Sequence, residues 1–120
     1  MKSEKREYKD YMADIWEAIN SIEKFTVGLT FEDFLRDERT LLAVIRKLEI
    51  IGEAARKIPE KVKKNYTQIP WKYMTGMRNK LIHEYFGVNT EVVWKTIKEN
   101  LPEVKEELKK VLKEMGINYQ

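Results

Sequence analysis

The chain has 120 residues, of which 42% are hydrophobic and 36% charged, and its net charge is +3. This is the size of one domain, so we expect residues 1–120 to form a single domain around one hydrophobic core. The absence of cysteine excludes disulfides and thiolate catalysis and argues against a structural zinc site. No apolar run is long enough to cross a membrane and the first ten residues are strongly charged, so we expect a cytoplasmic protein.

The first half of the chain predicts two long helices. Apolar residues at helical spacing predict the first from about Glu4 to Thr26, with Gly28 ending it. Thr30, followed three residues later by Asp33, predicts a capped short helical turn. The second long helix is predicted over residues 37–57, and the proline that follows makes its continuation unfavourable. No segment shows the alternation typical of a half-buried strand, so the expected class is all-α.

The second half continues the helical pattern. Residues 60–69 are polar and basic, and the sequence leaves open whether they form a short helix or a loop. A third long helix is predicted over residues 70–86, with Gly87 closing it. Thr90 is the expected cap of the last helix, which Pro102 either kinks or divides. These elements predict an antiparallel bundle of about four to five helices.

Positive charge is concentrated in one part of the chain. Residues 56–80 hold eight basic residues against one acid, a net charge of +7, whereas the remainder carries −4. This distribution predicts a face for an anionic ligand, although chance runs on solvated helix ends are common. The eight residues are Arg56, Lys57, Lys61, Lys63, Lys64, Lys72, Arg78 and Lys80.

The only histidine of the chain lies in the segment RNKLIHEYF at residues 78–86. In a helix, Asn79 and His83 are one turn apart, so the amide can orient the imidazole ring. Arg78 and Tyr85 lie two turns apart on a neighbouring stripe. A lone histidine is more often a surface or core residue, but a cation, an amide, an imidazole and a phenol so close together suit phosphodiester chemistry.

RNA provides its own nucleophile, the 2′-hydroxyl, so its cleavage needs a base, an acid and a cation but no metal ion. Because the chain has one histidine, it has no second imidazole for the other proton transfer. A two-fold homodimer with its axis near this helix would supply a second His83 and a second Arg78. A metal-hydrolase site is a poor alternative, since no second histidine or carboxylate set has ligand spacing.

These residues resemble a known family, the HEPN superfamily, and within it the HepT toxin subfamily. The segment from Arg78 to Tyr85 matches the family motif R-x4-H-x-Y, including the polar residue after the arginine. The flanking similarities extend over most of the chain: Ile50–Ala55 resembles the segment IIGEA, Pro70–Trp71 and Gly76–Arg78 resemble PW and GMR, and Phe86 and Val93–Trp94 fit the later pattern.

The resemblance implies a HEPN-type dimer whose two motifs meet, acting as a metal-independent endoribonuclease toxin without a cofactor. It also implies a cognate MntA-like nucleotidyltransferase antitoxin that silences the toxin by adenylylating Tyr85. By the same resemblance, His83 is the general acid or base, Arg78 stabilises the transition state and Asn79 orients the imidazole. Tyr85 positions the substrate as well as accepting the nucleotide.

Three further residues complete the predicted site. We expect Lys72 and Lys80, from the basic stretch, to contact the RNA substrate together with Tyr85. Glu53 is either a solvated charge or a supporting partner for the basic residues. The alternative function is a non-catalytic HEPN module in which Arg78 and His83 bind a nucleotide or a protein.

Overall fold

The computed structural model describes residues 6–83 and 89–117, with side chains placed for residues 6–77 and 89–117. Within these ranges the chain is helical and contains no strand, which confirms the predicted all-α bundle. The elements are α1 (Tyr8–Thr26), α2 (Phe31–Arg36), α3 (Glu38–Lys57), α4 (Glu60–Asn65), α5 (Trp71–His83), α6 (Thr90–Lys95), the π-helical turn η2 (Thr96–Asn100) and α7 (Leu101–Met115).

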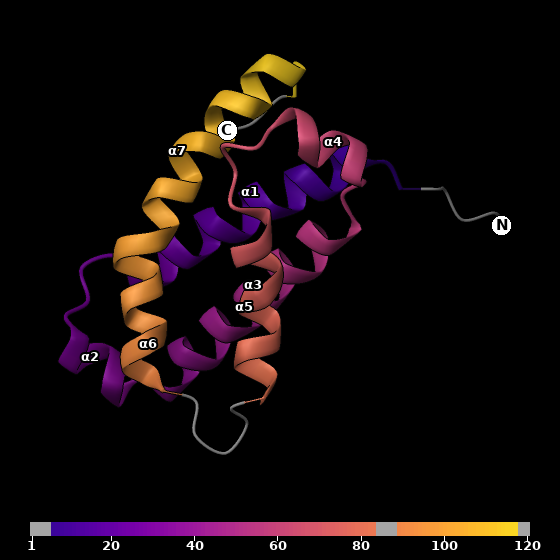
Figure 1. Ribbon diagram of the computed structural model, residues 1–120. Coiled ribbons are helices and arrows are strands. Elements are labelled where there is room, and N and C mark those ends of the chain that lie inside the picture. The colour runs from indigo at the N-terminus through magenta and orange to yellow at the C-terminus, as the bar shows by residue number, and fades with distance from the viewer. Residues whose placement is uncertain (1–5, 84–88, 118–120) are drawn as a thin grey trace, which may run out of the picture.

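Helix α3 lies at the centre of the bundle and packs against α1 on one side and α5 on the other. Figure 1 shows α3 running antiparallel to both, while α6 and α7 form one long column beside them. The fully buried side chains of α3 include Val44, Leu48 and Ile51, which belong to one continuous core with residues of α1, α5 and α7. None of the helices in the described ranges has the length and apolarity to cross a membrane.

The short helix α2 begins with the predicted capping arrangement. The Thr30 hydroxyl accepts a hydrogen bond from the backbone N–H of Asp33 (3.1 Å), and the Asp33 carboxylate accepts one from the N–H of Thr30 (3.0 Å). Asp37 caps α3 in a similar way, accepting from the backbone N–H and the hydroxyl of Thr40 at 3.0 and 2.6 Å. These hydrogen bonds hold the pKa of both carboxyls below the ordinary value of 3.8.

The cap of α6 was predicted wrongly. Thr90 is the first helical residue, and the cap is Asn89, whose side-chain oxygen accepts hydrogen bonds from the N–H groups of Glu91 (3.0 Å) and Val92 (3.2 Å). An asparagine at this position satisfies two of the N–H groups that a helix start leaves open.

Of the two alternatives predicted for Pro102, the structure has the second, because the proline lies in the first turn of a separate helix, α7. The chain passes through the π-helical turn η2 and continues as α7 from Leu101. Pro102 has no N–H and cannot donate a hydrogen bond to the carbonyl of Lys98. The turn before it has the hydrogen bond of a π-helix, from the N–H of Leu101 to the carbonyl of Thr96 five residues earlier. The Thr96 hydroxyl also bonds back to the carbonyl of Val92 at 2.9 Å.

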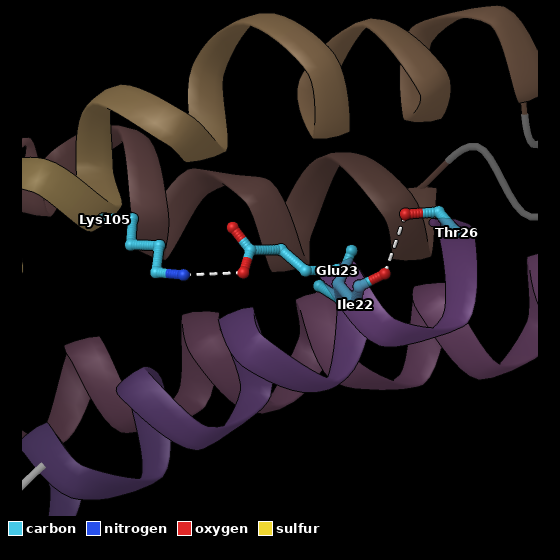
Figure 2. Close-up of polar contacts among 4 residues, drawn as sticks. All are labelled: Ile22, Glu23, Thr26 and Lys105. Carbon is cyan, nitrogen blue, oxygen red and sulfur yellow. Dashed lines mark hydrogen bonds and ion pairs between the residues drawn. The ribbon is translucent and has the colours of Figure 1, made fainter. Parts of the chain in front are cut away.

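Helix α7 is tied to α1 by an ion pair. The Lys105 Nζ donates to Glu23 Oε1 at 2.6 Å (Figure 2) and also lies 5.4 Å from the ring centroid of Trp16. Figure 2 also shows the end of α1, where the Thr26 hydroxyl donates to the carbonyl of Ile22 at 2.8 Å. Gly28 then turns the chain with a positive φ of 77°.

Candidate functional site

Helix α5 carries three of the four residues of the predicted motif. Its backbone is helical through Arg78, Asn79 and His83, so Asn79 and His83 are one turn apart. The side chains of residues 78–83, including Lys80, and the whole of Tyr85 lie outside the described residues. Their roles stay predictions, and only the backbone register locates the three residues on the helix.

One side of α5 is buried in the bundle. Trp71, Met74 and Met77 are buried along it, and α3 is the main neighbour of the helix. Positions three or four residues apart share a helix face, so Arg78, four residues after Met74, has the register of this buried side. The arginine position is therefore in line with the contact between α5 and α3.

The adjacent side of α5 is open. Lys72 is exposed there, and a Cβ atom added to Gly76 would meet no other atom within 4 Å. Asn79 follows Lys72 by seven residues and His83 follows Gly76 by seven, so both have the register of this open side. The motif is thus divided between two neighbouring sides of one helix, with the arginine position on one and the amide and imidazole positions on the other.

Four of the eight basic residues of the predicted anion-binding stretch line one groove of about 620 Å³. Arg56 comes from the end of α3, Lys63 and Lys64 from α4, and Lys72 from the first turn of α5. We call this the basic groove. Its other lining residues are Glu60, Thr67, Trp71, Thr75 and Gly76.

The rest of the basic stretch is distributed differently. Lys57 lies over α1, with its Nζ 5.6 Å from the ring centroid of Tyr11, and Lys61 is exposed on α4 outside the basic groove. The sequence analysis missed Thr75 and Gly76 as groove residues. Their helical register with Lys72 was the signal that could have found them, but the second wall, α4, was itself uncertain.

Glu53 lies on α3, the helix against which α5 packs. Its side chain is half-buried, and it is not an isolated charge in the structure. This position is compatible with the predicted supporting role. Gly52 beside it is buried within α3, although glycine is unfavourable inside a helix.

Metal ligands do not gather in the part of the chain with described side chains. No group of three or more histidine, cysteine, aspartate or glutamate residues there could hold a metal ion. The described ionisable groups of the basic groove are four cations and one carboxylate.

Comparison with known proteins gives a consistent result. The model of a family described as "Ribonuclease HepT-like" matches residues 15–111. A protein of Thermococcus cleftensis named "Probable ribonuclease HepT" is 54% identical over 91% of this chain and 99% of its own length. Two proteins of Methanocaldococcus jannaschii that carry the name "Putative RNase" are each 43% identical over 92% of this chain, covering 92% and 96% of their own lengths. No solved structure matches the chain significantly.

Proposed function

The chain belongs to the HepT-like ribonuclease family, and from that premise we propose that it is a metal-independent endoribonuclease toxin whose site forms between two copies of α5. Arg78, Asn79 and His83 are the proposed catalytic residues. The observation that carries the proposal is the helical backbone through residues 78–83, because it brings Asn79 and His83 to neighbouring turns.

In the proposed reaction an imidazole of His83 takes the proton of the RNA 2′-hydroxyl, and the 2′-oxygen attacks the adjacent phosphorus. Arg78 stabilises the negative charge that develops on the phosphorane oxygens. The bond from phosphorus to the 5′-oxygen then breaks, and a second imidazolium gives that oxygen a proton. The products are a 2′,3′-cyclic phosphate and a free 5′-hydroxyl, so no water, metal ion or oxidant is consumed.

The second imidazole is the reason for proposing a homodimer. The chain has a single histidine, so one imidazole acting as base and another acting as acid cannot both come from one copy. An isologous contact along α5 duplicates every residue near its axis, which gives one phosphate two imidazoles and two guanidinium groups. Lys72 and Lys80 would contact neighbouring phosphates, and Glu53 would support the cationic residues from α3.

The first test incubates purified protein with total RNA in EDTA, beside the His83→Ala and Arg78→Ala variants. We expect the wild-type protein to cleave RNA to cyclic-phosphate ends and both variants to lose this activity. Far-ultraviolet circular dichroism of the variants controls for folding. Intact RNA after incubation with folded wild-type protein would refute the catalytic proposal and favour a non-catalytic binding module.

The shared site has its own test. Wild-type protein is mixed with an equal amount of His83→Ala protein, and subunits are exchanged by refolding the mixture together. If both imidazoles of a dimer are required, activity falls to about a quarter of that of the same total amount of wild-type protein, since only a quarter of randomly formed dimers carry two. Residual activity near one half would mean that each subunit acts alone.

We further propose that the protein acts in the cytoplasm and is silenced there by a MntA-like nucleotidyltransferase antitoxin, which adenylylates Tyr85. A nucleotide on this residue would add an anion seven residues from Arg78 in the sequence, where it would compete with RNA for the guanidinium group. Mass spectrometry after co-expression with such an enzyme should show one or more added adenylyl groups on the peptide containing Tyr85. An unchanged peptide would overturn this part of the proposal.

A further inference from the structure

We propose that the basic groove binds the phosphate backbone of single-stranded RNA. The groove acts as a track that holds the strand on one side of the bond to be cleaved. The direction of the track relative to the cleaved bond rests on the proposed function. RNA binding in the groove does not, because it depends only on described side chains. The track would give the protein affinity for a length of strand and not for the cleaved phosphate alone.

The charge of the groove is suited to several phosphates. Arg56, Lys64 and Lys72 are exposed, so their charged ends are available to a ligand. Lys63 has only 14% of its side chain exposed and its Nζ lies 3.6 Å from the carboxylate of Glu60. The Glu60 side chain is 79% exposed, and it is the only acid among the described residues of the groove lining. Four cations against one exposed carboxylate leave a net attraction for an anion.

The shape of the groove also suits a strand. Its wall on α5 includes Gly76, where a Cβ atom would touch nothing within 4 Å. Glycine is unfavourable inside a helix, and none of the described side chains packs so closely on this position that it requires glycine. A bare backbone lets a ligand approach the helix closely, and the hydroxyls of Thr67 and Thr75 on the same lining are common donors to phosphate oxygens.

The groove leads toward the motif. Lys72 and Gly76 belong to the open side of α5, and Asn79 and His83 continue that register along the same helix. From Gly76 to His83 the helix rises about 10 Å, at about 1.5 Å per residue. Stacked nucleotides advance about 3.4 Å each, so about three nucleotides would separate the groove from the bond that is cleaved.

An acidic protein surface is the alternative to RNA as the anionic partner of such a groove. The lining favours RNA, because interfaces between proteins have apolar and aromatic centres and few lysines. Among the described residues of the groove lining the only large apolar one is Trp71, which is buried and donates its indole N–H to the carbonyl of Tyr66 at 3.0 Å. Lysine, arginine and hydroxyl groups along a channel are instead typical of contacts to a nucleic-acid backbone.

The test compares two double variants with the same change of charge. Arg56→Gln/Lys64→Gln removes two exposed cations of the groove, neither of which the proposed catalysis uses. Lys109→Gln/Lys113→Gln is the matched control, since both lysines are exposed on α7 and outside the groove lining. The probe is a fluorescent 12-nucleotide RNA with 2′-O-methyl groups, which cannot be cleaved through its 2′-oxygen.

Binding to this probe is measured by fluorescence anisotropy over a range of salt concentrations. Each phosphate contact on a single strand contributes a slope of about 0.7 to the dependence of log affinity on log salt. The groove variant should therefore lose about 1.4 of the slope and bind about 25-fold more weakly at 0.1 M salt, with the difference disappearing toward 1 M. The control should follow the wild type. Equal losses in the two variants would reduce the effect to general charge and overturn the proposal.

The kinetics of RNA cleavage provide a second test. On a cleavable 12-nucleotide RNA the groove variant should show a higher KM with little change in kcat, whereas on a trinucleotide both constants should match those of the wild type. A fall in kcat on the trinucleotide would overturn the proposal, because it would place the two cations at the reacting phosphate.

The two proposals fail in different ways. If the wild-type protein binds the 2′-O-methyl probe through the groove but cleaves no RNA, the proposed function fails and the track stands. If the wild type cleaves RNA and the groove variant binds the probe normally, the track fails. Normal RNA binding together with lost binding to a purified nucleotidyltransferase partner would likewise overturn it and assign the groove to an acidic protein.

Discussion

Replacing Gly76 with alanine should make the protein more stable. Gly76 lies inside α5 with no positive φ, and the new methyl group would meet no atom within 4 Å. The substitution therefore adds no clash and removes the backbone entropy that glycine loses in a helix, which is worth about 0.8–1 kcal/mol relative to alanine. For a chain of this length the midpoint of thermal unfolding should rise by about 4 °C.

The chain offers matched controls at Gly28 and Gly116. A Cβ atom there would also meet nothing within 4 Å, but their φ angles are +77° and +74°. Gly116 ends α7, and the N–H of Ile117 bonds to the carbonyl of Leu112 at 2.9 Å across it. Alanine at either position should lower the free energy of unfolding by about 1 kcal/mol, because a side chain is strained in the left-handed conformation.

The assay is unfolding in guanidinium chloride, followed by circular dichroism at several protein concentrations. Opposite signs for Gly76→Ala and the two controls would support the reasoning, since the three sites share open space and differ in backbone conformation. A lower stability of Gly76→Ala would refute it. Such a result would mean that another molecule or subunit packs against that point of α5 in solution.

Three further predictions concern the helices that position α5. Asn89→Ala should reduce the free energy of unfolding by about 1 kcal/mol, as measured by chemical denaturation, because two N–H groups at the start of α6 lose their acceptor. Leu108→Ala should reduce it by about 3 kcal/mol by the same assay, since this fully buried side chain leaves a cavity between α7 and the core. The pKa of Asp37 is lowered in the folded state by its hydrogen bonds to Thr40, so its contribution to stability is complete above pH 3.8 and is lost as the pH falls through the folded value. Denaturation of Asp37→Ala should accordingly show a loss of stability at pH 7 that narrows by pH 2, and a gap that widens on acidification would contradict this assignment.

The long helices could be predicted from the sequence because each has a continuous apolar stripe and a recognisable start or end. The capping pair Thr30 and Asp33 is an example, since its two hydrogen bonds depend only on residues three apart. Trp16 was missed, although it is buried, because the apolar pattern of α1 was complete without it. Its burial depends on α7, whose Lys105 lies over the indole ring.

The candidate site was predictable only in part. The spacing of Asn79 and His83 follows from helical geometry, and the backbone of α5 has it. The division of α5 into a buried and an open side required the position of α3, which no local pattern specifies. The basic groove could not be predicted from the sequence either. Arg56 and Lys72 are 16 residues apart in the sequence, and they line one groove only because α4 forms a wall of it.

The π-helical turn at Thr96–Asn100 determines how the last column faces the rest of the protein. It holds one residue more than an α-helical turn of the same rise. If the same number of residues formed a regular α-helix instead, every later side chain would be rotated about the helix axis by about 100° relative to α6. Leu108 and Val111 would then leave the core and Lys105 would leave Glu23. The wider turn therefore keeps α7 in register with the core, and a relative that lacks one residue here can form a plain α-helix with the same apolar pattern in its final helix.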